Sequence, residues 1–185
     1  LSSAGVFQSF DSRLADRLFL TRAARPDVLI VAIDNESLQK IGRWPWPRAT
    51  HGRLLETFAE AKPAAVVFDV GFFEASHDAD DSAFARAMGA VPTVLTVEGA
   101  DLRQQDGLLR SQTLLAPIAI LRERAAALGH VHTPADADGI GRRFPLPLAA
   151  SSGTFEPLAV AALRAAGKLP DGATFRFLGQ QPPRA

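Results

Sequence analysis

Two aspartates each follow a short apolar run, a placement that could support chemistry. Asp34 comes directly after residues 28–33 (VLIVAI), and Asp69 comes directly after residues 64–68 (AAVVF). If both runs are strands of one parallel sheet, both aspartates lie at the edge where open α/β sheets bind ligands. Two carboxylates there could hold a divalent cation or act as an acid and a base. The simpler interpretation, which the spacing alone favours, is that each aspartate caps a helix or fixes a loop.

A stiff aromatic segment lies between these two runs. Residues 44–48 read WPWPR, and each proline fixes its own φ and favours an extended conformation of the residue before it. The indoles of Trp44 and Trp46 could form an aromatic lip over a ligand, with Arg48 contacting an anionic group. Alternatively, one indole packs in the core and the other is exposed, and this alternative is the one we favour.

Histidines supply a second group of candidate residues. His130 and His132 lie two apart on a run that we expect to be extended, so they project from the same face of a sheet, while His51 lies in a predicted helix. Two histidines would need a third ligand to form a zinc site, and the sequence reveals none. Histidines on strands are more often hydrogen-bonded packing residues, so we predict no metal site and no cofactor.

The common catalytic signatures are absent from the sequence. It has no G-x-S-x-G elbow, no phosphate-binding G-x-x-x-x-G-K-[ST] loop and no H-E-x-x-H helix. The absence of cysteine excludes thiolate metal sites and cysteine nucleophiles. We therefore predict no catalytic residue.

Length and composition narrow the class of protein. A chain of 185 residues with 47% hydrophobic and 22% charged residues predicts one globular domain. Twenty basic and twenty acidic residues give a net charge of zero, which does not support nucleic-acid binding. The longest apolar runs, residues 28–33 and 114–121, fall short of the roughly 20 residues that a membrane-spanning helix needs.

The order of the predicted elements indicates an α/β fold. We expect a three-layer fold with a mostly parallel central sheet, helices on both faces and an antiparallel C-terminal hairpin. Residues 98–112 are polar and weakly patterned, which predicts a mobile loop. The predicted helices span residues 1–20, 35–41, 47–62, 82–88, 117–128 and 157–167, and the predicted strands span residues 28–33, 64–68, 92–97, 130–133, 140–148 and 174–178. We expect one domain over residues 1–185, with an amphipathic helix and linker in residues 1–25 and the α/β core in residues 26–180.

Several short motifs follow one another in a specific order. They are residues 27–34 (DVLIVAID), 41–48 (IGRWPWPR), 66–69 (VVFD), 72–74 (FFE), 129–132 (GHVH) and 138–143 (DGIGRR). Together they resemble the second family of CHASE domains, over roughly residues 11–180. Members of that family are extracytoplasmic sensory domains that follow one transmembrane helix and precede others. Those helices lead to a nucleotide cyclase, a histidine kinase, a serine/threonine kinase or a diguanylate cyclase.

The resemblance implies a sensor or input domain of a membrane-bound bacterial receptor, without catalysis of its own. It also implies that residues 1–20 continue the first membrane span, and we expect a homodimer that uses this helix as its contact. The signal would be an unidentified small molecule or protein bound beyond the strand ends. We expect the residues around that site to be Asp34, Asn35, Trp44, Trp46, Arg48, Asp69, Phe72 and Glu74.

Two other functions stay open at this point. One is a metal-dependent hydrolase in which Asp34 and Asp69 hold the cation and a histidine acts as acid or base. The other is a structural spacer that recruits an extracytoplasmic protein without any small ligand.

Overall fold

The computed structural model describes residues 27–133 and 145–169, and it divides the chain into two compact units. Of the described residues, 27–44 belong to the first unit, and 45–133 and 145–169 belong to the second. The predicted amphipathic helix of residues 1–20, residues 140–144 of the predicted strand 140–148 and the predicted strand 174–178 lie outside the described residues.

The first unit contains the predicted helix α2 (Asn35–Ile41). The Asp34 carboxylate accepts hydrogen bonds from the backbone N–H of Ser37 at 2.9 Å and from its hydroxyl at 2.8 Å, so Asp34 is the N-cap of this helix. At the other end, Gly42 adopts a φ of 115°, a conformation that favours glycine.

The prediction of a buried strand at residues 28–33 is wrong for this structure. These residues form no strand, and their large side chains are exposed, from 43% for Ile33 to 85% for Ile30. A strand exists only when a neighbouring strand completes its hydrogen bonds. Residues 27–44, the described part of the first unit, contain no other strand.

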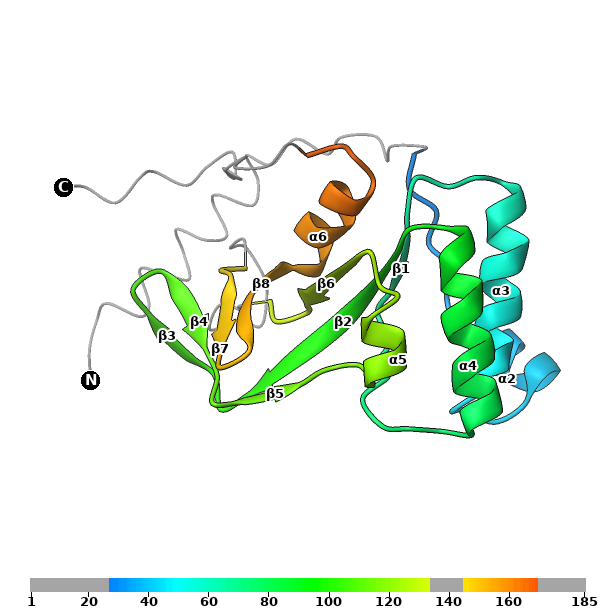
Figure 1. The fold of residues 1–185 in the computed structure, drawn as a ribbon, viewed down its shortest axis with the longest axis horizontal. Helices are drawn as coiled ribbons and strands as arrows, with labels where there is room; N and C mark the ends of the chain where they lie inside the picture. Colours follow the sequence, from blue (N-terminus) through cyan, green and yellow to red (C-terminus); the bar gives the residue numbers. More distant parts are fainter. Residues whose placement is uncertain (1–26, 134–144, 170–185) are drawn as a thin grey trace, which may run out of the picture. The chain divides into compact units, whose positions relative to one another are not determined.

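The second unit is built on a mixed sheet (Figure 1). Its described strands are β1 (Val66–Phe68), β2 (Thr93–Ala100), β3 (Arg103–Gln105), β4 (Leu108–Arg110), β5 (Thr113–Leu115), β6 (Ala127–His130), β7 (Leu148–Ala150) and β8 (Gly153–Pro157). They follow the order β1-β2-β6-β8-β7-β4-β3, with β5 paired to β2. The pairs β1–β2, β2–β6, β6–β8 and β4–β7 are parallel, whereas β7–β8, β3–β4 and β2–β5 are antiparallel.

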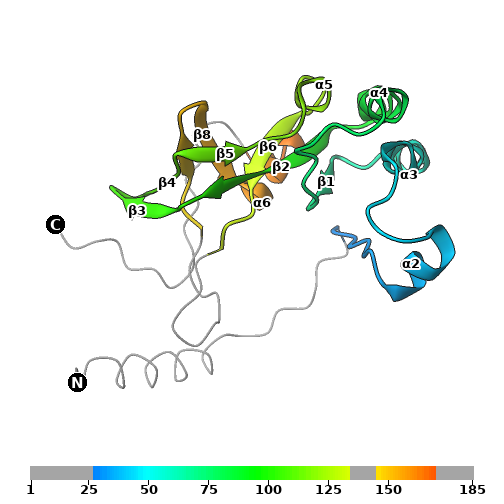
Figure 2. The ribbon, with the colours of Figure 1, turned by 90° about the horizontal axis from the view of Figure 1, so that it is seen from below.

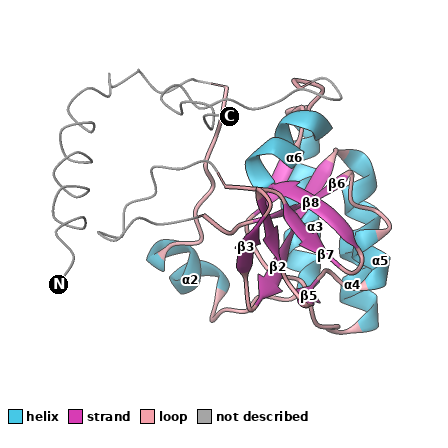
Figure 3. Ribbon diagram, turned by 90° about the vertical axis from the view of Figure 1, so that its left-hand side faces the viewer, coloured by secondary structure: helices cyan, strands magenta, loops and turns pink. Residues whose placement is uncertain are grey.

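Helices cover both faces of this sheet, as expected (Figures 2 and 3). Residues 93–97 of β2 are all buried, as a strand covered on both faces requires. On β6, Leu128 packs against the core beneath one group of helices, while Gly129 lies against α6 on the other face. The described helices of the second unit are α3 (Arg48–Glu60), α4 (Asp78–Ala87), the 3-10 turn η1 (Met88–Ala90), α5 (Ala119–Arg122) and α6 (Leu158–Ala165).

Prolines begin two of these helices. Pro47 and Pro157 precede α3 and α6 with φ values of −53° each, so both helices start where the sequence predicts. Helix α4 starts at Asp78, four residues before the predicted start. The main core cluster lies between α3, α4, α5 and the first strands, and its buried members are Leu55, Phe68, Phe72, Phe84, Ala85, Ala87, Met88, Val91, Leu95 and Leu121.

Two predictions for the middle of the chain are wrong. Residues 98–112 are not a loop, because β2 extends to Ala100 and β3 and β4 form a hairpin. Asp106 and Gly107 turn that hairpin with φ values of 52° and 73°, as a type I′ turn requires. The predicted helix 117–128 is reduced to the four residues of α5, and residues 127–130 form β6 instead. A short apolar run fits a buried strand as well as a helix, so hydrophobic pattern alone did not separate them.

The fold class is confirmed. The sheet is mostly parallel, and an antiparallel hairpin lies toward the C-terminus, where β7–β8 joins Leu148 to Phe155 and Ala150 to Gly153. Its strands are not the predicted pair, residues 130–133 with 140–148, because β6 runs parallel to both of its neighbours, β2 and β8.

Candidate functional site

Arg48, the first residue of α3, holds the segment that follows β1. Its Nη2 donates a hydrogen bond to the backbone oxygen of Glu74 at 3.0 Å. Its Nε lies 3.5 Å from Oδ1 of Asp81, and its guanidinium carbon lies 4.5 Å from the centre of the Phe72 ring. One cation therefore contacts a carbonyl, a carboxylate and an aromatic face, each of which favours positive charge.

Asp81 completes this arrangement from the first turn of α4. Its Oδ2 accepts a hydrogen bond from the backbone N–H of Ser76 at 2.9 Å. Only 12% of the Arg48 side chain and 5% of the Asp81 side chain are exposed, so the ion pair is shielded from water. Burial lowers the pKa of Arg48, and the charge of Asp81 opposes that change. We refer to Arg48, Phe72, Glu74, Ser76 and Asp81 as the Arg48 network.

Three hydrogen bonds fix the connection between β1 and α4, and two of them lie within the Arg48 network. The backbone of Glu74 binds Arg48, and the backbone of Ser76 binds Asp81. The backbone oxygen of Phe72 accepts a third hydrogen bond, from the N–H of Ile118 at 3.1 Å. The segment is therefore bonded to α3, to α4 and to Ile118, the residue before α5.

A cluster of aromatic rings around His51 packs against Phe72, a member of the network. His51 is 2% exposed, and its ring centre lies 5.3 Å from that of Phe72, 5.9 Å from those of Phe68 and Phe84, and 6.2 Å from that of Trp46. The three phenylalanine rings contact one another edge to face at 5.0–5.6 Å. Burial lowers the pKa of His51 to about 4, and the positive charge of Arg48 adds to the lowering. His51 is therefore a neutral packing residue at neutral pH.

A pocket of about 470 Å³ opens beside the network. Asp81 lies both in its wall and in the ion pair with Arg48. A ligand in this pocket would therefore be next to the buried carboxylate. The residues around the pocket are Ala75, Asp78, Asp81, Ser82, Ile118, Ala119 and Ile120.

The two histidines at the end of β6 share one face, as predicted. The rings of His130 and His132 are stacked, with centres 5.7 Å apart and planes 22° apart. Within residues 27–133 and 145–169, no three histidine, aspartate or glutamate side chains gather in a way that could hold a metal ion.

The predicted ligand-binding residues divide between the two units. Asp34, Asn35 and Trp44 belong to the first unit, where Asp34 is an N-cap and the hydrogen bonds from Ser37 lower its pKa. Trp44 is 37% exposed. The simpler interpretation of Asp34, as a helix cap, is therefore the one the structure shows.

The second unit brings four of the predicted residues together and leaves one apart. Arg48, Phe72 and Glu74 meet in the network, and Trp46 lies beside His51, whose ring contacts Phe72. Trp46 and Phe72 are buried, at 8% and 0% exposure. One buried indole and one exposed indole agree with the alternative favoured for the aromatic segment. Asp69 follows β1 and is exposed. The ligand-binding roles of all these residues remain predictions.

Asp81, the partner of Arg48, is not among the site residues predicted from the sequence. The predicted helix begins at residue 82, whereas α4 begins at Asp78, and the carboxylate of Asp81 accepts a hydrogen bond from the backbone N–H of Ser76. A signal was present, because an acidic residue in the first turn of a helix often accepts a hydrogen bond from the backbone before it. Nothing in the spacing joins residue 81 to residue 48.

Comparisons with known proteins identify the family. In the described part of the chain, no helix combines the length and hydrophobicity needed to cross a membrane. The search of curated proteins and the search of solved structures each gave no match. The model of the CHASE2 domain family, an extracellular sensory family without catalytic activity, matches residues 1–182. The chain therefore belongs to the CHASE2 domain family.

Proposed function

We propose that this chain is the input domain of a membrane-bound bacterial receptor and that it couples an extracytoplasmic signal to a cyclase or kinase output in the same protein. The observation that supports this proposal is the family match over residues 1–182. Binding would be the whole activity of the domain. A ligand can act in this way only by binding one conformation more tightly than another.

The Arg48 network supplies an element through which a binding event could change conformation. Its buried charges join α3, α4 and the segment after β1 in one set of contacts. A buried charge without a partner costs several kcal/mol. Such a network therefore favours a few discrete arrangements, in each of which every charge is paired, over a gradual change. A displacement of the Asp81 carboxylate would therefore weaken its contacts with both Arg48 and Ser76.

The proposed ligand site adjoins this network. The pocket walls include Asp81 and Ala75, and Ala75 directly follows Glu74. The predicted residues Asp69 and Glu74 precede the pocket on the same segment, and both are exposed. The proposal keeps Asp34, Asn35, Trp44, Trp46, Arg48, Asp69, Phe72 and Glu74 as candidate ligand-binding residues. It also keeps a receptor homodimer with residues 1–20 as its first contact.

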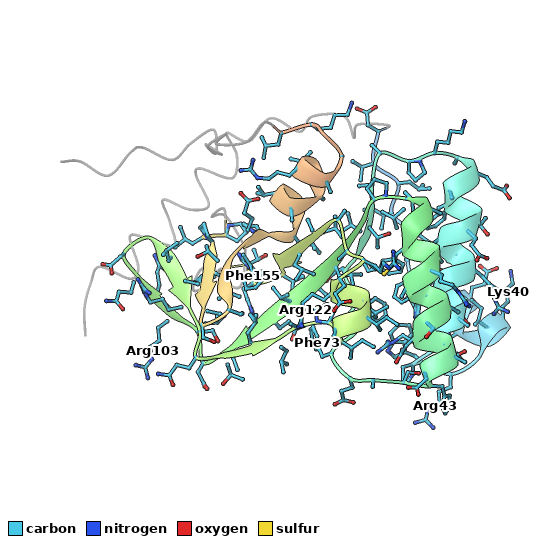
Figure 4. The ribbon with its side chains drawn as sticks, in the orientation of Figure 1. Lys40, Arg43, Phe73, Arg103, Arg122 and Phe155 are labelled. Carbon is cyan, nitrogen blue, oxygen red and sulfur yellow. The ribbon has the colours of Figure 1, made fainter. Side chains whose placement is uncertain are left out.

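The proposal is tested in the full receptor, in membranes. Arg48→Met removes the buried cation but keeps a long apolar side chain, and Arg103→Met removes an exposed cation from β3, where the side chain points away from the sheet (Figure 4). We expect the first variant to change the basal rate of cyclase or kinase output and the second to leave it unchanged, at equal amounts of membrane-inserted receptor. Equal output from both variants would contradict the coupling that we propose.

A further inference from the structure

The histidine pair continues the sheet beyond the point where the ladder between β2 and β6 stops. The last residues paired by the two strands are Val97 and His130. Two residues further along both strands, the backbone N–H of Gly99 donates a hydrogen bond to Nε2 of His132 at 2.8 Å. On the edge of β2 that faces β6, a side chain thus replaces the backbone as the acceptor, while β5 pairs with residues 98–100 on the other edge.

The ring of His130 also accepts a hydrogen bond from a backbone N–H. The backbone N–H of His132 donates to Nδ1 of His130 at 3.2 Å. His130 is only 1% exposed, and its ring lies against that of His132. A backbone N–H can only donate, so each ring must present an unprotonated nitrogen to it. The bonds therefore require both rings to be neutral, with the proton on Nδ1 of His132 and on Nε2 of His130.

Protonation is incompatible with this arrangement. A charged imidazole carries hydrogens on both nitrogens, so charging His132 would point an N–H at the N–H of Gly99. Charging His130 would do the same to the N–H of His132. If both rings were charged, two cations would also stack face to face. Each of these events breaks a contact that holds the ends of β2 and β6 together.

The surrounding charges set how readily the rings take up protons. Burial is the largest influence on both: it lowers the pKa of His130 to about 4 and lowers that of His132. Glu98 of β2 opposes the lowering at His132, and the backbone of Leu146 opposes it at His130. On β8 and α6, Glu156 and Arg164 form an ion pair at 2.7 Å, so their charges balance each other.

We propose that His130 and His132 form an acid-sensitive contact and that protonation of this pair separates Gly99 of β2 from the segment that follows β6, while β2 stays paired with β5 on its other edge. The pKa of each ring is lower in the closed contact than in the open one. Between these two pKa values, each ring raises the equilibrium constant for opening about tenfold for every unit by which the pH falls. His132 is partly exposed, so protons can reach the pair from solvent. The contact could serve as a signal only at the proposed extracytoplasmic location, where external acidity would act on it. The acid sensitivity of the contact does not depend on that location.

The test is a pH titration of the 185-residue chain by nuclear magnetic resonance, from pH 7.5 to pH 4. We expect the neutral rings to show the two proton positions given above, and the Gly99 amide signal to change together with the titration of His132. His132→Gln supplies an acceptor that does not titrate, so the pH-dependent change at Gly99 should disappear in this variant. His77→Gln, at an exposed histidine before α4, is the matched control and should retain it.

Two results would overturn the proposal. The first is a wild-type chain in which His132 carries its neutral proton on Nε2, because that nitrogen could not then accept from Gly99. The second is a Gly99 signal that does not change while His132 titrates. Both are measured on the wild-type chain, so the test stands even if a variant fails to fold. Neither depends on the location of the receptor, which is tested separately.

Discussion

Removing the positive charge of Arg48 should destabilise the second unit strongly. At the observed separation of 3.5 Å from Asp81, the attraction is about 5 kcal/mol for an effective dielectric constant of about 20. Desolvation of the pair opposes most of this attraction, but Arg48→Met leaves the Asp81 carboxylate buried without its cation. We expect the variant to lose about 3–5 kcal/mol of unfolding free energy, the usual cost of removing one partner of a buried pair.

A double-mutant cycle separates the ion pair from simple loss of packing. Asp81→Asn keeps an oxygen that can accept the hydrogen bond from Ser76 but removes the negative charge. In Arg48→Met/Asp81→Asn no charge is left unpaired, so the double variant should be more stable than Arg48→Met alone by about 1–3 kcal/mol. Arg103→Met is the surface control and should change stability by no more than about 0.5 kcal/mol.

Urea denaturation at pH 7 measures these differences. With a slope of about 2 kcal/mol per molar urea, the Arg48→Met midpoint should fall by about 2 M. The reasoning is refuted if Arg48→Met costs less than about 1 kcal/mol, since a buried carboxylate without its cation cannot be so cheap. It is also refuted if the effects of the two single changes simply add, because additive effects mean that the two side chains do not interact.

Two further predictions concern packing and pH. Gly129→Ala would place a methyl group 2.6 Å from the Cα of Leu158, so it should cost about 1–3 kcal/mol in urea denaturation. In Gly89→Ala the added methyl group meets nothing within 4 Å, so this control should leave the unfolding free energy nearly unchanged. If both variants lost the same unfolding free energy, the packing of β6 on α6 would be contradicted. Since burial lowers the pKa of His51 and His130 from 6.5 to about 4, the unfolded chain binds protons first on acidification. The unfolding free energy should therefore fall between those values, by about 1.4 kcal/mol per group and pH unit, and an unchanged urea midpoint would contradict this.

Much of the fold could be predicted from local signals. The prolines at residues 47 and 157 mark the starts of α3 and α6, because their φ is already that of a helix. The cap at Asp34 and the glycine at residue 42 likewise mark the ends of α2. These signals succeed because cause and effect lie within a few residues of each other.

The errors arise where the deciding contact is distant. Residues 28–33 have the composition of a buried strand, but composition does not supply the neighbour that a strand needs. The predicted helix 117–128 ends just before Gly129, whereas Gly129 lies within β6, where α6 leaves no room for a side chain. The β3–β4 hairpin is different, because Asp106-Gly107 is a local turn signal from which a two-residue hairpin could have been predicted.

The candidate site shows the same limit. Arg48 and Glu74 could be proposed from the sequence because both lie in conspicuous motifs. Their link through one hydrogen bond, and the role of Asp81 as the counter-ion, depend on how α3 packs against α4. Chemistry that depends on such packing cannot be read from spacing along the chain.

The location of the domain is the central claim, and the composition of the chain permits a direct measurement of it. The chain has no cysteine, so Arg103→Cys introduces a single thiol on the exposed strand β3. In intact cells carrying the full receptor with its other cysteines replaced, a small maleimide that cannot cross the cytoplasmic membrane should label this thiol before lysis. Labelling that occurs only after the cells are broken would place the domain in the cytosol and contradict the account.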